Sequence, residues 1–132
     1  MSVSFSMAKD VNILDFEAVA DGKTLTTKSI QDAIDQCYDT GGGIVTVPAG
    51  TYLTTTVYLR DGVNLHIQEG ATLLGSTDRN AFIGAVVFAE NVQNAAITGL
   101  GTIDGQGFKE FFPKQGPRHH NIFLLDCKNI TV

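Results

Sequence analysis

From Gly43 onward the chain consists of short apolar stretches with a period of two, and each stretch ends within a few residues at a turn signal. The stretches cover residues 44–47, 57–59, 63–67 and 72–74, and the signals include Pro48, Asp61-Gly62 and Glu69-Gly70. Side chains alternate between the two faces of a strand, so each stretch predicts a short β-strand. No Asn-Gly pair joins the stretches, which favours a chain that winds over one that folds back in hairpins.

A weak internal repeat supports winding. Residues 91–97 and 126–132 follow one pattern at an offset of 35 residues, with Asn94 aligned on Asn129 and the small or apolar positions coinciding. Repeats of about 20–50 residues mark solenoids, in which each coil buries its inward side chains against the coils above and below. The pattern therefore predicts a β-solenoid.

The period changes to that of a helix between residues 27 and 39. One face of this segment is apolar, at positions i, i+3, i+4 and i+7, namely Ile30, Ala33, Ile34 and Cys37. Thr26 or Thr27 can supply the N-cap oxygen, and Gly41-Gly42-Gly43 is expected to end the helix. We expect the helix to cap the N-terminal end of the solenoid, which would otherwise be an open edge.

The pattern divides the chain into three parts. Residues 1–10 are expected to be flexible or foreign to the natural protein, residues 11–43 form an N-terminal strand (11–19), a turn at Asp21-Gly22 and the capping helix, and residues 44–132 form the first coils. The sequence stops at Val132 in the middle of a predicted strand, which indicates a C-terminal truncation. Such an open coil exposes apolar core, so we expect self-association.

Composition excludes several classes of function. With a net charge of −5 and a pI of about 4.9, the chain is a poor binder of nucleic acid or of an anionic membrane. Cys37 and Cys127 are too far apart in sequence for a metal-spaced pair and are expected to be free thiols. The first residues do not form a signal peptide, so the chain is cytoplasmic or comes from a secreted protein whose export signal was removed.

Five stretches carry a resemblance to a known family. They are D-F-E-A-V-A-D-G (15–22), G-G-G-I-V-T-V-P-A-G-T-Y-L (41–53), E-G-A-T-L-L-G-S (69–76), G-L-G-T-I-D-G-Q-G (99–107) and C-K-N-I-T-V (127–132). The first two occur across many β-helix enzymes and phage tail proteins. Together with the other three, they resemble the N-terminal part of glycoside hydrolase family 28, the polygalacturonase-like enzymes of the pectate-lyase-like superfamily.

The resemblance implies a mainly β fold, a right-handed single-stranded parallel β-helix with one N-terminal capping α-helix. It also implies a parent glycosidase that hydrolyses pectin or a related acidic polysaccharide by inversion, with no cofactor. In the family, the catalytic carboxylates come from N-T-D-G, Asp-Asp, G-H-G and R-I-K stretches, and none of these is present here. We therefore expect no catalytic residue and no metal ligand in this chain, and expect the chain alone to be inactive.

One basic cluster is the candidate substrate-binding site. It consists of Arg118, His119 and His120, with Lys109 and Lys114 nearby, and it could hold the carboxylates of a polyuronate. A solvated loop is the alternative interpretation. Relatives of the family often have Arg-Pro before the apolar run and a Trp after D-G-Q-G, whereas this chain has Arg118-His119-His120 and Phe108.

Other conspicuous residues are assigned structural roles. Asp104 precedes Gly105 in a turn, where aspartate commonly bonds the local backbone. The glycines of 99–107 do not form a phosphate loop, because no long helix follows them. His66 is expected to face outward, and Cys127 to lie in the core.

Two further classes of function remain open from the sequence. The chain could be a non-catalytic β-helix module that binds glycans, as in phage tails or adhesins, or it could come from a lyase or epimerase of the same superfamily. An acidic calcium site with an Arg or Lys base downstream would favour the lyase, and continued repeats without acidic clusters would favour the binding module.

Overall fold

The computed structural model describes residues 9–77, 85–106 and 120–132. The elements are β1 (Lys9–Asn12), η1 (Ile13–Phe16), β2 (Asp21–Leu25), α1 (Thr27–Asp39), β3 (Gly43–Val47), β4 (Gly50–Thr54), β5 (Val57–Tyr58), β6 (Val63–Ile67), β7 (Ala71–Gly75), β8 (Ala85–Glu90), β9 (Gln93–Thr98), β10 (Thr102–Asp104), β11 (His120–Leu125) and β12 (Lys128–Thr131).

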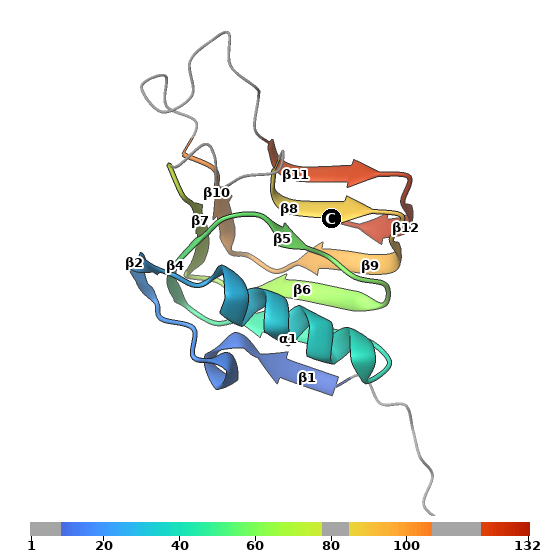
Figure 1. Ribbon diagram of the computed structural model, residues 1–132, viewed down its shortest axis with the longest axis horizontal. Coiled ribbons are helices and arrows are strands. Elements are labelled where there is room, and N and C mark those ends of the chain that lie inside the picture. Colours follow the sequence, from blue (N-terminus) through green and yellow to red (C-terminus); the bar gives the residue numbers. More distant parts are fainter. Residues whose placement is uncertain (1–8, 78–84, 107–119) are drawn as a thin grey trace, which may run out of the picture.

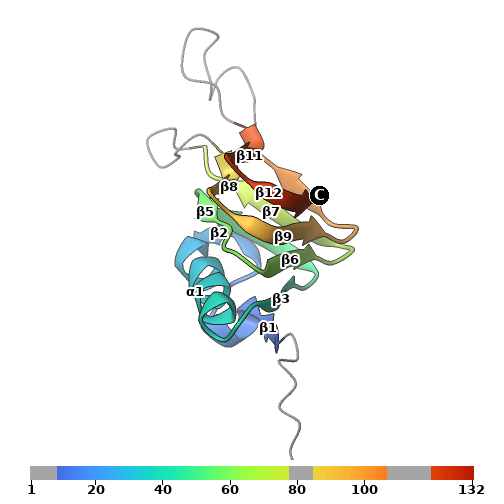
Figure 2. The ribbon, with the colours of Figure 1, turned by 90° about the vertical axis from the view of Figure 1, so that its right-hand side faces the viewer.

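The strands form three parallel sheets. Sheet I has the order β1-β3-β6-β9-β12, sheet II the order β10-β7-β4-β2, and sheet III the order β11-β8-β5. The chain visits sheets I, II and III in turn and then returns to sheet I one level higher, so that successive coils stack along one axis (Figures 1 and 2). All strand pairs within the described residues are parallel. The predicted β-solenoid is confirmed.

The internal repeat is also confirmed as a stacking register. β12 pairs with β9 so that Ile130 faces Ala95, an offset of 35 residues, as the sequence pattern predicted. Asn94 and Asn129 both adopt the left-handed conformation, with φ of 57° and 55°, and the Asn129 Nδ2 donates to Asn94 Oδ1 at 2.6 Å. Asparagine tolerates this conformation better than most residues, which explains its recurrence at this turn.

The core is made of apolar rows that run through the coils. One side chain in each row comes from each coil, as in Val45–Leu65–Ile97 of sheet I and Tyr52–Leu73–Ile103 of sheet II. In the first three coils these residues are buried, and burial of each large apolar side chain contributes about 1.5–3 kcal/mol. Toward the C-terminal end the corresponding side chains of β10, β11 and β12, among them Ile103, Ile122 and Ile130, are only half-buried.

Helix α1 takes the place of a sheet III strand in the first coil. It follows β2 of sheet II and precedes β3 of sheet I, as β5 lies between β4 and β6, and it lies next to β5 in the stack (Figure 1). Its apolar face, Ile30, Ala33, Ile34 and Cys37, is completely buried, as predicted.

The side chain of Gln31 completes the open edge of β5. Gln31 Nε2 donates to the carbonyl of Tyr58 at 3.0 Å, and Gln31 Oε1 accepts from the N–H of Tyr58 at 2.7 Å. The amide thus replaces the backbone of a neighbouring strand. The predicted capping role of the helix therefore has a direct hydrogen-bonding basis, because an unpaired strand edge would otherwise face solvent or another chain.

The sequence predicted the C-terminal end of α1 correctly, but it did not predict the hydrogen bond at the N-cap. At the C-terminal end, Gly42 N–H donates to Cys37 O and Gly41 N–H donates to Tyr38 O, the paired bonds of a Schellman motif, with positive φ at both glycines. At the N-terminal end, the prediction of a threonine hydroxyl as N-cap acceptor is wrong. Thr26 is the N-cap residue, but its hydroxyl donates to Leu53 O at 2.8 Å.

The predicted strand at 11–19 is also wrong. The strand ends at Asn12, whose side chain accepts from the N–H of Leu14 at 2.9 Å and starts the 3-10 helix η1. The predicted turn at Asp21-Gly22 lies instead at the start of strand β2, and Gly50, two residues after the signal at Pro48, begins strand β4. Both glycines have positive φ, and the sequence signal for a turn thus marks the corner before the strand.

The described part of the chain has no helix long and apolar enough to cross a membrane.

We predict that Gln31→Leu destabilises the fold. Leucine keeps the helix propensity but removes two hydrogen bonds to Tyr58, each of which contributes about 0.5–1.5 kcal/mol. Urea unfolding followed by circular dichroism should show a lower midpoint, and the Tyr58 amide should exchange faster with solvent. The control is Lys28→Met on the same helix, which removes only an exposed Lys28–Asp32 ion pair. Equal midpoints for the two variants would contradict the proposed role of Gln31.

Candidate functional site

The connections from sheet II to sheet III differ in length far more than the others. They comprise residues 55–56, 76–84 and 105–119 in successive coils, that is 2, 9 and 15 residues. The connections at the other two corners from β3 onward have two to four residues. Loops that vary in length on a rigid scaffold are the usual carriers of binding and catalysis. The corner between sheets II and III is therefore the first place to search for a functional site.

The outer face of sheet II leads to this corner. Its exposed or half-buried side chains form two columns across the strands, Asp21–Thr51–Thr72–Thr102 and Leu25–Leu53–Leu74–Asp104. Apart from the aspartate at one end of each column, one column carries hydroxyl groups and the other aliphatic groups. Such a surface offers hydrogen bonds and apolar contact to an extended polymer, but threonine and leucine supply no acid or base.

The two carboxylates on this face cannot form a catalytic pair. Asp21 lies on β2 and Asp104 on β10, at opposite edges of the four-stranded sheet. Three strand spacings separate them by about 14 Å. The two carboxyl groups of an inverting glycosidase lie about 6.5–9.5 Å apart, and those of a retaining one about 5–5.5 Å. Asp21 and Asp104 are therefore too far apart to act together as the acid–base pair of a glycosidase.

A small network fixes the start of the longest connection. Asp104 Oδ1 accepts from the N–H of Gln106 at 2.9 Å, so the predicted structural role of Asp104 is confirmed. Gln106 Nε2 in turn donates to Gly75 O at 2.7 Å, and Asn121 Nδ2 donates to Ile103 O at 3.1 Å. The ends of the connection, near Gln106 and Asn121, are therefore tied to the neighbouring coil and to β10.

The predicted basic cluster falls almost wholly outside the described residues. Arg118 and His119 belong to the undescribed part, as do Lys109 and Lys114. The backbone of His120 opens β11 and pairs with Ala85, but its side chain is not described. The substrate-binding role of the cluster stays a prediction. In the sequence, Arg118 and His119 directly precede His120, the first residue of β11.

The glycines of 99–107 have a packing role. A Cβ on Gly99 would lie 2.0 Å from the Ile67 carbonyl oxygen, and a Cβ on Gly101 would lie 2.3 Å from Ile67 Cγ2. The Gly101 N–H donates to Ile67 O at 2.9 Å. These residues allow one coil to turn close over the coil below, and the structure supports the rejection of a phosphate loop.

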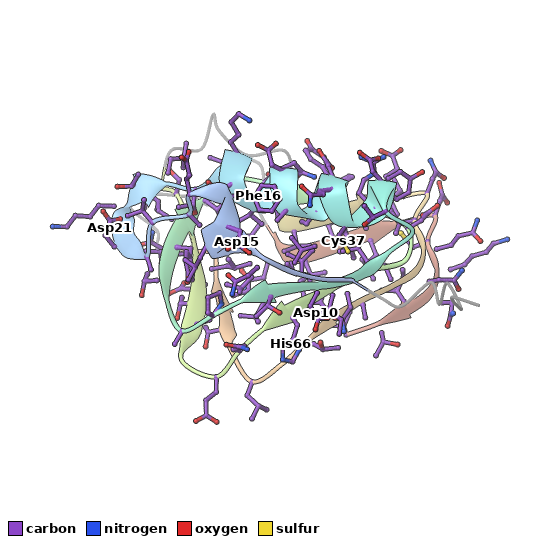
Figure 3. All side chains as sticks on the ribbon, turned by 90° about the horizontal axis from the view of Figure 1, so that it is seen from below. Asp10, Asp15, Phe16, Asp21, Cys37 and His66 are labelled. Carbon is purple, nitrogen blue, oxygen red and sulfur yellow. The ribbon has the colours of Figure 1, made fainter. Side chains whose placement is uncertain are left out.

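The outer face of sheet I carries a polar chain that the sequence did not reveal. Thr98 donates to Asn64 Oδ1 at 2.8 Å, and Nδ1 of His66, which is labelled in Figure 3, lies 2.8 Å from the same hydroxyl. Because the single hydroxyl proton goes to Asn64, His66 Nδ1 must be the donor to Thr98. His66 faces outward and is half-buried, as predicted. The contact joins residues 32 positions apart, so no local motif could indicate it.

The cysteines offer no nucleophile. Cys37 is buried in the core, where desolvation, and to a smaller extent the nearby Asp10 carboxylate, raise the pKa of the thiol. A raised pKa disfavours the reactive thiolate. Cys127 is a half-buried free thiol packed against the core, with Sγ 3.4 Å from Ala89 O. In the described residues, no group of three His, Cys, Asp or Glu side chains is arranged to hold a metal ion.

Comparison with known proteins identifies the family. Residues 10–132 match the family model described as "Rhamnogalacturonase A/epimerase, pectate lyase-like". The chain belongs to this family.

The fold and the sequence agree with membership of the pectate-lyase-like family. The chain is 34% identical to rhamnogalacturonase A of Emericella nidulans over 98% of its length, and 34% identical to a mannuronan C5-epimerase of Azotobacter vinelandii over 73%. An exopolygalacturonase structure from Thermotoga maritima superposes with a TM-score of 0.73 at 31% identity, covering 77% of this chain. These similarities confirm the right-handed parallel β-helix.

The chain spans only part of these relatives. It covers 25% of the rhamnogalacturonase, 20% of the epimerase and 26% of the exopolygalacturonase chain.

Acid is predicted to remove the contribution of Asp21 at the edge of sheet II. Backbone N–H groups of Thr24 and Lys23, and the Thr24 hydroxyl, bind this carboxylate and lower its pKa from 3.8 to about 2. A depressed pKa stabilises the folded state above the unfolded value, and this stabilisation is lost as the pH falls from about 4 to about 2. The unfolding free energies of the native chain and Asp21→Ala should therefore differ at about pH 6 and converge at about pH 2. If the difference in unfolding free energy between the native chain and Asp21→Ala stayed constant with pH, the Asp21 carboxylate would not stabilise the fold through its lowered pKa.

Proposed function

We propose that this chain is the N-terminal portion of a hydrolase that cleaves the backbone of pectin or a related acidic polysaccharide by inversion. The observation that carries the proposal is the family match over residues 10–132, together with similarity to a rhamnogalacturonase and an exopolygalacturonase. In this proposal the chain provides the capped first coils, and later coils provide the catalytic carboxylates.

The packing of the last coil supports a longer solenoid. Leu124 has an exposed fraction of 41% and Val132 one of 70%, whereas Ala89, which aligns with Leu124 in the coil below, is fully buried. A further coil would cover these side chains and pair with the free edges of β10, β11 and β12. A second copy could cover the same edge, and self-association of the isolated chain remains part of the proposal.

The basic cluster is proposed to hold substrate at the corner of sheets II and III. Arg118 and a protonated histidine can each bind a uronate carboxylate, and arginine can do so in a bidentate manner. The hydroxyl and aliphatic columns of sheet II lie on the strands that lead to this corner. The cluster is proposed to bind and not to catalyse.

An epimerase is the second candidate, because the chain is as similar to the mannuronan C5-epimerase as to the rhamnogalacturonase, at 34% identity each. The epimerase match covers less of the chain, 73% against 98%, which favours the hydrolase. A hydrolase adds water across the glycosidic bond and releases a saturated reducing end. An epimerase inverts a sugar carbon and leaves the polymer length unchanged.

The proposal predicts that the purified 132-residue chain hydrolyses neither polygalacturonate nor rhamnogalacturonan. The full natural gene product should release saturated reducing ends from one of the two polymers, and proton nuclear magnetic resonance should show inverted anomeric configuration in the first product. An unsaturated product would indicate a lyase, and altered sugar configuration at constant polymer length would indicate an epimerase. Reducing ends released by the 132-residue chain alone would overturn the proposal.

The same assay tests the basic cluster in the full gene product. Arg118→Gln with His119→Gln should raise KM by about tenfold per lost charge-assisted contact and leave kcat nearly unchanged. The matched control is Lys28→Gln, an exposed cation of α1 away from both the cluster and the face of sheet II. A loss in kcat with unchanged KM would show that the cluster does not act through substrate binding.

A further inference from the structure

The outer face of sheet III carries a hollow that the pectinolytic proposal does not use. The hollow has a volume of about 350 Å³ and lies between the C-terminal turn of α1 and strands β5 and β8. Its lining includes Tyr38, Tyr58, Asp61, Phe88 and Glu90. A second hollow of about 460 Å³ shares Tyr38 and Asp61 with the first and extends past Gln93 and Asn94. We call the two together the aromatic groove.

Aromatic side chains are the unusual feature of this surface. Tyr58 projects from the solvent face of β5 and Tyr38 from the last turn of α1, and both are 37% exposed. The ring of Phe88 packs edge to face on Tyr58, with centroids 5.8 Å apart, and fixes it in place. Exposed aromatic surface beside polar groups commonly marks a binding site on a soluble protein.

The polar groups of the groove complement hydroxyl groups. Asp61 and Glu90 are exposed carboxylates, and Gln93 and Asn94 are exposed amides. Carboxylates accept hydrogen bonds, and amides both donate and accept them. A sugar ring presents C–H groups on its faces, which suit aromatic rings, and hydroxyl groups at its edge, which suit these side chains. The combination of rings and planar polar groups therefore fits a saccharide.

The charge of the groove disfavours a polyuronate. Arg60 is the cation of the lining, and its guanidinium is already engaged, with Nη1 3.1 Å from Asp35 Oδ1 and Cζ 4.0 Å from the centre of the Tyr38 ring. Asp61 and Glu90 remain on the groove as negative charges. Uronate carboxylates would be repelled there, whereas a neutral sugar would not.

We propose that the aromatic groove binds a neutral oligosaccharide, at a site separate from the sheet II face. In this arrangement Tyr58 and Tyr38 contact sugar rings, while Asp61 and Glu90 accept hydrogen bonds from their hydroxyl groups. The inference does not depend on the hydrolase proposal. It concerns binding at sheet III and holds for the chain whether or not the full gene product cleaves pectin.

The test is a titration of the 132-residue chain with two sets of tetrasaccharides of equal length. Neutral tetramers of galactose, arabinose, xylose and glucose are compared with tetragalacturonate, by calorimetry and by amide nuclear magnetic resonance. At least one neutral tetramer should bind with a Kd of about 1 mM or lower and shift the signals of Tyr38, Tyr58 and Gln93. Tetragalacturonate should leave those signals unchanged.

Point variants distinguish the effect of the Tyr58 ring on oligosaccharide binding from the effect of the Glu90 charge. Tyr58→Ala should weaken binding of the neutral tetramer by about tenfold, the equivalent of one aromatic contact. Tyr58→Phe keeps the ring and should keep most of the affinity, which guards against loss through misfolding. Glu90→Gln should reduce the discrimination against tetragalacturonate. Leu100→Ala, at a 79% exposed position on the β9–β10 turn, should have no effect.

Three outcomes would overturn the proposal. The first is that no neutral tetramer binds at about 1 mM. The second is that a neutral tetramer binds but Tyr58→Ala, with an unchanged fold by circular dichroism, retains full affinity. The third is that tetragalacturonate shifts the groove signals as strongly as the neutral sugar. None of these results bears on hydrolysis by the full gene product, which the reducing-end assay measures.

Discussion

The pairing of Gln31 with both backbone polar groups of Tyr58 is the contact that covers the first edge of sheet III, at the N-terminal end of the solenoid. An open strand edge can pair with another chain, so covering this edge favours stacking in one direction only. In sheet III, α1 takes the place of the first strand and Gln31 supplies the missing hydrogen bonds. The apolar face of the same helix is buried with the core residues of the first coils. Strand β8 then pairs with β5, and β11 pairs with β8, to form the rest of sheet III.

Above that start, the coils keep a constant interior and vary at one corner. The offset between stacked residues is 20 for Gly43 and Val63, 30 for Val57 and Val87, and 35 for Ala85 and His120. The additional residues enter between sheets II and III, while the inward rows keep one side chain per coil. The stability of the fold therefore resides in the inward rows, whereas its variation resides in the connections that follow Thr54, Gly75 and Asp104.

Much of the fold could be predicted from the sequence because its signals are local and periodic. The i, i+3, i+4, i+7 pattern from Ile30 to Cys37 and the repeat that aligns Asn94 with Asn129 both appear directly in the structure. Predictions failed where a side chain overrode the pattern, as when Asn12 caps η1 and ends the first strand. The site was less predictable. Contacts such as His66 to Thr98 and Arg60 to Asp35 join residues 25 to 32 positions apart, and only the stacking of the coils brings them together.

The most direct test of the account is the intact mass of the natural gene product, with peptide sequencing of the region after Val132. The account predicts a chain several times longer than 132 residues, since this one spans about a quarter of its relatives, with N-T-D-G and G-H-G stretches in later coils. Those coils would cover Leu124 and carry the catalytic carboxylates. A natural product that ends at Val132 would contradict the hydrolase and leave glycan binding as the better explanation of this fold.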